Sequence, residues 1–229
     1  MNQPVLKFDN VRFSYDDAYE ILKGVSFEIA QGEKVALVGL NGSGKSTLLL
    51  HSNGLLFPSS GQVFVDGIPV DAHSRKKVTL SIGFVFQNAD DQLFMPTVEE
   101  DIAFGPRNMK LKTEEISRRV NEALSSTGTS HLRNRPPFHL SGGEKRMVAI
   151  ATVLSMKPSL LVMDEPTSGL DFLATRRFID LIDSLPHSLL MSTHDIEMAR
   201  ELCSRAILID NGKIAFDGPI ENLPYPSYS

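Results

Sequence analysis

The sequence is poor in cysteine: Cys203 is the single thiol among its 229 residues. One thiol cannot form a disulfide within the chain, and such usage fits a reducing compartment. Because Cys203 lies in a helix-like run, we expect a packed thiol rather than a reactive one. A chain of this length is ample for a packed core.

Long apolar runs and an excess of positive charge are also missing. No stretch approaches the ~18 consecutive apolar residues that a membrane-spanning helix needs. The first seven residues, MNQPVLK, hold no basic segment followed by an apolar run, so no signal peptide is predicted. The formal net charge of −5 argues against a nucleic-acid-binding protein that neutralises phosphates. We therefore expect a soluble chain that acts at a membrane only through a partner.

A glycine-rich segment, residues 39–47, follows the apolar run 35–38 and leads into the leucines 48–50. Its G-x-x-x-x-G-K-S spacing predicts a phosphate-binding loop between a strand and a helix. In such a loop backbone N–H groups approach phosphate oxygens, Lys45 contacts the β- and γ-phosphates, and the Ser46 hydroxyl binds Mg²⁺. A flexible loop with a solvated lysine is the alternative. The predicted nucleotide-binding residues are Gly39, Asn41, Gly42, Ser43, Gly44, Lys45, Ser46 and Thr47.

Strand patterns precede and follow this loop. Residues 4–30 alternate apolar and polar positions, which predicts antiparallel strands with one solvated face. Tyr15 falls between them, where its ring could stack on adenine or be an ordinary surface tyrosine. Residues 62–65 and 78–86 are further predicted strands. The second delivers Gln87 to its end, where sites on α/β sheets collect.

From residue 88 to about residue 154 the pattern changes to helices, which suggests a helical subdomain inserted between sheet-forming segments. Its last helix begins at Ser141 with S-x-x-E spacing to Glu144, the pattern of a capping box. Such a serine is a helix cap more often than a ligand. However, two glycines at a helix start also expose N–H groups, so the cap could also bind an anion.

The apolar run 159–163 ends in two adjacent acids, Asp164 and Glu165. A strand buried on both faces would bring Asp164 to the carboxyl edge of a parallel sheet, where it can hold Mg²⁺. Glu165 would then lie closer to the γ-phosphate and could polarise an attacking water. In isolation, two acids in a turn before Pro166 are the alternative.

Three later segments complete the pattern. Asp171 stands at a predicted helix start, and the predicted strand 188–193 leads directly to His194. Asn211 and Gly212 form a strong hairpin signal between two apolar runs.

Taken together and in their order along the chain, six of the motifs resemble those of the ATP-binding cassette ATPases, and the resemblance covers nearly the whole sequence. They comprise residues 39–47, Gln87, residues 140–144, 160–165 and 168–171, and His194. The resemblance implies an α/β fold with a P-loop NTPase core, whose parallel sheet is flanked by helices, an N-terminal antiparallel β-subdomain and an inserted helical subdomain. It also implies a single domain over residues 1–229, in which 1–87 and 156–229 form the nucleotide-binding core. Residues 88–155 form the helical subdomain with the signature motif.

The family's nucleotide contacts fall on matching positions. Tyr15 is where the family stacks adenine, and Gln87 belongs to the loop that senses Mg²⁺ and the membrane partner. Ser141, Gly142 and Gly143 match signature residues that reach the γ-phosphate bound by the other subunit. Each active site is thus expected to be shared by two chains, and a monomer should bind ATP but hydrolyse it poorly.

The family's catalytic positions match as well. Asp164 is then the magnesium-side carboxylate, which acts with Ser46 and Gln87, and Glu165 is the catalytic carboxylate. Asp171 is an inter-subunit contact. His194 is the γ-phosphate switch, with a role as general base as the alternative.

A narrower resemblance, to the ATPases of energy-coupling-factor importers, lies in residues 86–94 and 96–106. It is nearest to importers of cobalt or nickel ions. In that group the stretch after the loop glutamine forms a short helix near the groove for the transmembrane coupling protein. Ala89 stands where the group usually has proline, and Glu144 replaces the usual glutamine of the wider family. The short segment after the Asn211 hairpin favours the metal-ion type over longer vitamin-import ATPases.

The expected function is ATP hydrolysis, with ATP and Mg²⁺ as cofactors, that powers cobalt or nickel uptake at the cytoplasmic face of the cell membrane. The expected partners are a second copy or a similar ATPase, an integral membrane coupling protein and a separate substrate-binding membrane protein. No nucleic-acid partner is expected. The alternatives are a vitamin importer (such as one for biotin), another ABC transporter, a soluble cassette protein acting on ribosomes or DNA, and a P-loop kinase or GTPase.

Overall fold

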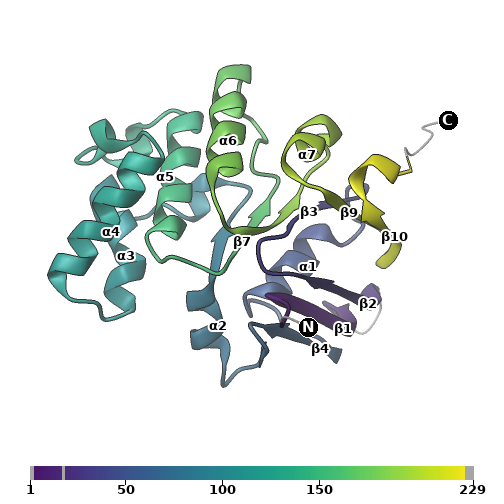
Figure 1. Cartoon of the computed structure of the whole chain (residues 1–229). Helices are drawn as coiled ribbons and strands as arrows, with labels where there is room; N and C mark the ends of the chain where they lie inside the picture. The colour runs from purple at the N-terminus through teal and green to yellow at the C-terminus, as the bar shows by residue number, and fades with distance from the viewer. Residues whose placement is uncertain (1–2, 17–18, 225–229) are drawn as a thin grey trace.

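The computed structural model describes residues 3–16 and 19–224, whose backbone folds into two β-sheets flanked by helices (Figure 1). The ends of the predicted 1–229 domain, residues 1–2 and 225–229, lie outside the described residues, as do residues 17–18. Within the described ranges, no helix has both the length and the apolar character that crossing a bilayer requires.

The N-terminal segment forms an antiparallel sheet, as its alternating pattern predicts. In Figure 1 it lies at the lower right. Phe8 stands opposite Phe27 on the neighbouring strand, and their rings stack with centroids 4.8 Å apart. The strands, in the order β2-β1-β4-β5, are β1 (Leu6–Ser14), β2 (Glu20–Ile29), β4 (Ser60–Val65) and β5 (Ile68–Pro69).

The second sheet is parallel except at one edge. Its strands, in the order β10-β9-β3-β8-β7-β6, are β10 (Lys213–Pro219), β9 (Arg205–Asp210), β3 (Lys34–Val38), β8 (Ser188–Ser192), β7 (Leu160–Asp164) and β6 (Ile82–Val85). Strand β10 pairs antiparallel with β9 across the predicted hairpin at Asn211 and Gly212. Strands β6, β7 and β8 are buried along their whole length, because both faces of the sheet are covered.

Helices connect the strands of the parallel sheet, and α3, α4 and α5 form a cluster on the left of Figure 1. The α-helices are α1 (Lys45–Ser52), α2 (Arg75–Ser81), α3 (Val98–Asn108), α4 (Thr113–Ser126), α5 (Gly142–Leu154), α6 (Phe172–Ser184) and α7 (Ile196–Leu202). Short 3-10 turns are η1 (Ala89–Asp91), η2 (Ser130–Leu132), η3 (Pro137–His139) and η4 (Ile220–Asn222).

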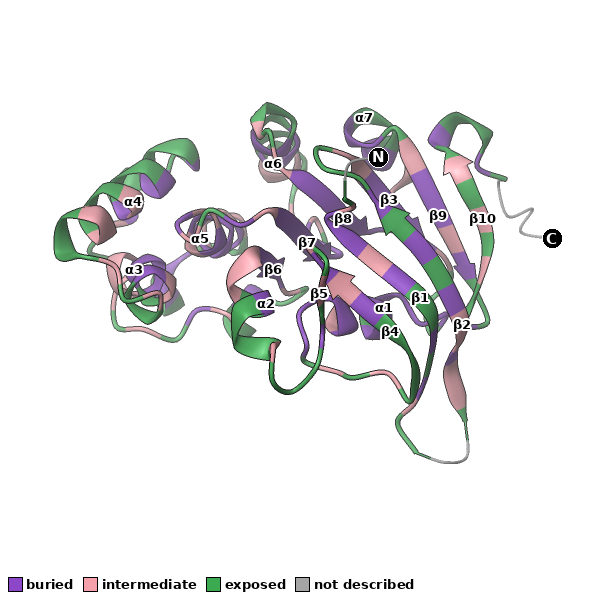
Figure 2. Cartoon of the chain, turned by 60° about the horizontal axis from the view of Figure 1, so that its bottom comes forward, coloured by how far each residue is buried: buried purple, intermediate pink, exposed green. Residues whose placement is uncertain are grey.

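The two faces of the parallel sheet enter different cores. On one face, α1 and the antiparallel sheet pack over side chains such as Val162 and Ile207. On the other face, α5, α6 and α7 pack over Met163 and Met191. A third core lies among α3, α4 and α5, which Figure 2 shows as a group beside the sheets. Helix α5 contributes to both the second and the third core, so it joins the helical cluster to the sheet.

The predicted strand at 78–86 is wrong in its first half. Residues up to Ser81 belong to α2, and β6 begins at Ile82. A turn sets the helix start, because the Asp71 carboxylate accepts hydrogen bonds from the backbone of His73 and Ser74. This start signal lies upstream of a short apolar run whose period is equally compatible with a strand or a helix.

Candidate nucleotide-binding site

The turn between β3 and α1 has the geometry of a phosphate-binding loop. Gly39, Gly42 and Gly44 all have positive φ, at 151°, 79° and 109°. At Gly39 a Cβ atom would lie 2.3 Å from the Ile209 carbonyl oxygen, so only glycine fits there. No side chain caps the start of α1, which leaves its first-turn N–H groups available to an anion.

The Lys45 side chain contacts the start of this loop. Its Nζ donates to the carbonyl oxygens of Gly39 at 2.8 Å and Leu40 at 3.1 Å, and the residue is 7% exposed. Among the described residues, none of the ion pairs involves this ammonium. The positive charge is therefore held at the loop by neutral carbonyls, which leaves it to compensate a phosphate.

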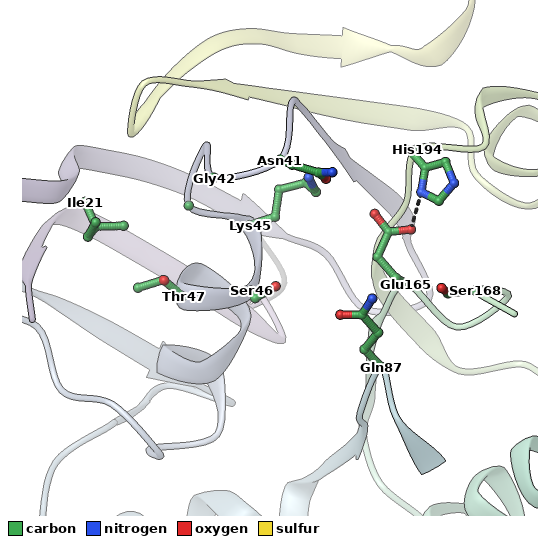
Figure 3. Close-up of a pocket in the computed structure, with 11 residues that line it drawn as sticks. Ile21, Asn41, Gly42, Lys45, Ser46, Thr47, Gln87, Glu165, Ser168 and His194 are labelled. Atoms are coloured by element: carbon green, nitrogen blue, oxygen red, sulfur yellow. Dashed lines mark hydrogen bonds and ion pairs between the residues drawn. The ribbon is translucent and has the colours of Figure 1, made fainter. Parts of the chain in front are cut away.

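Distant parts of the chain meet the phosphate loop around one cavity of about 450 Å³ (Figure 3). In Figure 3, Lys45 and Ser46 lie on one side, and Gln87, Glu165 and His194 face them from the ends of the parallel strands. These three side chains follow β6, β7 and β8, so the sheet edge collects them as the sequence predicts. The cavity is lined by Ile21, Asn41, Gly42, Gly44, Lys45, Ser46, Thr47, Gln87, Glu165, Ser168 and His194.

Glu165 is held at both its backbone and its side chain. Its φ of 43° places a non-glycine residue in the left-handed region, a strained conformation that surrounding contacts must impose. The Glu165 N–H donates to the Ser192 carbonyl oxygen at 3.1 Å and to the Ser192 hydroxyl at 3.0 Å. Its carboxylate pairs with Nδ1 of His194 at 2.8 Å. The carboxylate is thereby aimed into the cavity at the phosphate loop.

Asp164 is the last residue of β7 and directly precedes Glu165. It does not line the cavity, is 8% exposed, and accepts a hydrogen bond of 2.5 Å from the Ser192 hydroxyl. Ser192 therefore fixes both acids of the pair. Sequence reasoning missed this serine, because it looks like an ordinary residue of a buried strand and its partners lie on β7.

The variant Ser192→Ala is expected to lower both stability and turnover. The buried Asp164 carboxylate loses a donor, which costs about 1 to 3 kcal/mol in the free energy of unfolding. We expect kcat to fall on the order of 10-fold, because Asp164 and Glu165 lose their shared anchor. Urea denaturation and phosphate release measure the two effects.

Ser155→Ala is the matched control, because the buried Ser155 hydroxyl donates to the Ile102 carbonyl oxygen far from the cavity. It is expected to lose stability but keep kcat. Equal kcat values for the two variants would contradict the role given to Ser192.

Tyr15 lies beside the phosphate loop, at the edge of the site. It is 63% exposed, its hydroxyl is 3.2 Å from Oγ1 of Thr47, and its ring meets Phe13 edge-on at 4.9 Å. Ile21 on β2 lines the cavity and adds an apolar surface that the sequence pattern did not single out. An exposed aromatic face and an aliphatic side chain next to the loop are suited to a flat base.

The predicted signature residues lie elsewhere. Ser141 forms the predicted capping box with Glu144, and the hydrogen bonds from the Ser141 N–H and hydroxyl hold the pKa of the Glu144 carboxyl below its usual value. Asp171 caps α6 through the Ala174 N–H at 2.8 Å. Ser141, Gly142, Gly143 and Asp171 line a second cavity, of about 1010 Å³, and none of them lines the cavity at the phosphate loop. One chain thus carries two separate halves of the predicted site.

The chemistry around the first cavity suits Mg²⁺ in complex with phosphate. The Ser46 hydroxyl, the Gln87 amide and the neighbouring Asp164 carboxylate offer the hard oxygen atoms that this ion prefers. In residues 3–16 and 19–224 no group of three or more His, Cys, Asp or Glu side chains is placed to hold a metal ion. A donor set this small fits an ion that takes its other ligands from substrate and water.

Cys203 is packed, as predicted. It is 4% exposed in the core between the sheet and α7, and burial raises the pKa of its thiol to about 12. A thiol that stays protonated is not a nucleophile, so it plays no part in the site.

Comparison with known proteins agrees with this geometry. The family model for ABC transporters matches residues 22–168. The chain is 43% identical over 219 residues to the energy-coupling factor transporter ATP-binding protein EcfA of Methanocaldococcus jannaschii, covering 93% of this chain and 78% of that protein. These matches define the class: the chain belongs to the ABC transporter family, and it is an ATP-binding, ATP-hydrolysing cassette.

Solved structures of ABC cassettes share the fold of this chain. CbiO1 of Clostridium perfringens, part of the ABC transporter complex CbiONQ, has a TM-score of 0.87 and 39% identity, covering 96% of this chain and 90% of that one. A dimeric ATP-binding cassette in a post-hydrolysis state with ADP and Pi has a TM-score of 0.83 and 30% identity, covering 94% and 98%. The predicted fold class and the resemblance to energy-coupling-factor ATPases are confirmed.

Proposed function

We propose that this chain is the ATPase subunit of an energy-coupling-factor importer and that it works as a dimer. The single observation that supports a dimer is the separation of the two half-sites within one chain. The phosphate loop and Glu165 lie around one cavity, and Ser141 and Asp171 lie around another. Two subunits related by a two-fold axis can bring each half against its complement. The similar cassette solved as a dimer with ADP and Pi supports this arrangement.

Within the shared site, the phosphate loop and Lys45 bind the β- and γ-phosphates, while Tyr15 and Ile21 hold the base. The oxygen of a water molecule attacks the γ-phosphorus as its bond to the ADP oxygen breaks, and Glu165 accepts the proton of that water. His194, paired with Glu165, contacts the γ-phosphate. Ser46, Gln87 and Asp164 would hold Mg²⁺, which would supply positive charge to offset that of the transferred phosphoryl group.

The membrane partner is proposed to dock beside residues 88–94, the stretch that resembles the importer ATPases. Phe94 is 62% exposed, and its ring packs edge-on against that of Phe104, which is 40% exposed, with centroids 5.0 Å apart. An exposed aromatic pair of this kind is more typical of an interface than of open surface. This contact would hold the dimer at the cytoplasmic face of the membrane.

The imported substrate is proposed to be cobalt or nickel ions, on the strength of the motif resemblance in residues 86–106. A vitamin such as biotin is the alternative, because a separate membrane protein selects the substrate in such importers. The partner ATPase is proposed to be a second copy or a similar chain, since either can supply the complementary half-site.

Purification of the tagged chain from detergent-solubilised membranes tests the transport role. An integral membrane protein should co-purify, and Phe94→Ser should lose most of it while keeping ATP binding. Phe138→Ser is the control and should keep the membrane protein. Phe138 is also an exposed aromatic residue, at 72%, but it lies in η3, outside the stretch proposed to contact the membrane partner. Recovery of the wild-type chain without any membrane partner, or with RNA or DNA in a salt-sensitive complex, would favour the soluble cassette instead.

A further inference from the structure

A buried arginine connects the signature helix to the Gln87 loop. Arg146 lies on α5, is 3% exposed, and reaches across to the end of β6. Its Nη1 donates to the Phe86 carbonyl oxygen at 2.6 Å, and its Nη2 donates to the Gln87 carbonyl oxygen at 2.5 Å. Successive carbonyls of an extended strand point to opposite sides, so the chain must bend at Gln87 for one guanidinium to bind both.

The placement of Arg146 is energetically costly. Burial alone lowers its pKa, no nearby carboxylate counteracts this, and its Nε has no partner among the described residues. An arginine stays protonated at neutral pH nonetheless. A buried cation whose polar contacts are two backbone carbonyls forms strong, charge-assisted hydrogen bonds to them. Those two carbonyls are therefore held firmly.

Two more side chains, Gln92 and Lys145, join the same segment to α5. The Gln92 amide nitrogen donates to the Ala149 carbonyl oxygen and to the Thr152 hydroxyl, both at 2.8 Å, while its oxygen accepts from the Phe86 N–H at 3.3 Å. Lys145 pairs with Asp90 at 2.6 Å. Residues 86–92 are thus fastened at three places along one helix.

The fastened segment reaches the nucleotide cavity through Gln87, and the helix to which it is fastened begins at the signature motif. The Gln87 side chain points into the cavity that holds Glu165 (Figure 3). Ser141 caps the same helix that carries Arg146. The orientation of Gln87 therefore depends on where α5 lies.

We propose that Arg146 is a positioning residue for ATP hydrolysis, which holds the carbonyls of Phe86 and Gln87 so that the Gln87 side chain faces the nucleotide. As a consequence, residues 86–92 move as one unit with the signature end of α5. The proposal rests on the function proposed above for Gln87. Lysine cannot fully replace this arginine, because an ammonium lacks the planar fork that binds two acceptors at fixed spacing.

Arg146→Met, Arg146→Lys and Gln87→Ala test the proposal, with Arg119→Met as the matched control. Arg119 also joins two helices, through Nη1 bonds of 3.4 and 3.1 Å to the carbonyl oxygens of Ser155 and Met156, but at the far end of α5. Three quantities are measured for each variant: kcat, the Kd for ATP, and amide hydrogen exchange across residues 86–92.

Arg146→Met is expected to lower kcat by about 10- to 100-fold, as for a catalytic group displaced by about 1 Å. Its Kd for ATP should stay within about twofold, because the phosphate loop is untouched. Exchange across residues 86–92 should rise. Arg146→Lys should fall between Arg146→Met and wild type, and it carries the test if the methionine variant does not fold. Arg119→Met should keep wild-type kcat and wild-type exchange in this segment.

The proposal is overturned if folded Arg146 variants keep the wild-type kcat, or if Arg119→Met lowers kcat as much as Arg146→Met does. It is also overturned if amide exchange across residues 86–92 is the same in the Arg146 variants as in wild type. Normal turnover in Gln87→Ala, by contrast, would overturn the proposed role of Gln87. The exchange measurement would then still show whether Arg146 holds the segment. The two failures are therefore distinguishable.

Discussion

Glu165→Gln is expected to lose nearly all turnover while keeping ATP binding. The amide preserves the size of the side chain, and an amide oxygen can still accept from Nδ1 of His194. The backbone contacts to Ser192 are unaffected by the change. What is lost is the base that takes a proton from the attacking water, so kcat should fall by roughly 10²- to 10⁴-fold.

The same variant should accumulate as an ATP-bound dimer. If two subunits close over ATP before hydrolysis, a variant that cannot hydrolyse ATP should remain in the closed dimer, because it cannot form the ADP-bound state that dissociates. Gel filtration with ATP and Mg²⁺ should show a dimer, and the same run with ADP should show a monomer. Equilibrium binding of a fluorescent ATP analogue measures the Kd alongside phosphate release.

Glu114→Gln is the control for this experiment, because Glu114 is an exposed acid in the first turn of α4. It should match wild type in turnover and in elution volume. Normal turnover by Glu165→Gln would show that another group activates the water, with His194 as the first candidate.

Ser141→Arg is expected to abolish turnover although Ser141 lies outside the phosphate-loop cavity. In the proposed dimer, a long cationic side chain at this cap would enter the partner's nucleotide site and block closure. We expect kcat to fall by at least about 100-fold, as for a lost transition-state contact, with the Kd for ATP in the monomer unchanged. Wild-type specific activity should rise with protein concentration, whereas that of the variant should stay flat.

Thr97→Arg separates the interface effect from the loss of a helix cap. Thr97 caps α3 with its side chain accepting from the Glu100 N–H, an arrangement close to that of Ser141 and Glu144. Both variants should lose about 1 kcal/mol of stability with the cap, but Thr97→Arg should keep its turnover. Specific activity that is independent of concentration, together with an active Ser141→Arg, would instead indicate a cassette that hydrolyses ATP as a monomer.

The sequence predicted those parts of the site that follow from local chemistry. The glycine spacing before Lys45 requires a loop with positive φ angles, and the buried run before Asp164 requires a central strand. Parallel strands then bring Gln87, Glu165 and His194 to one edge, whatever the details of packing. Cap signals such as Ser141 are local as well, and for this reason they could be placed on helix starts without a structure.

What the sequence could not reveal depends on contacts between distant segments. Ser192 and Arg146 look like ordinary members of a strand and a helix until their partners on β7 and after β6 are known. The error at 78–86 has a related cause, because a short apolar run does not determine its own secondary structure. The separation of the two cavities was expected only from the family resemblance, since motif order along a chain does not by itself say which motifs share a pocket.

A mixing experiment tests the shared site most directly. Lys45→Ala damages the phosphate loop and Ser141→Arg damages the complementary surface, so each variant alone should be nearly inactive. In a mixed dimer one site combines both defects, and the other combines an intact phosphate loop with an intact signature. The account predicts that mixing the two inactive proteins restores ATP hydrolysis well above the sum of the separate preparations. Activity that stays at that sum, under conditions where subunits exchange, would contradict it.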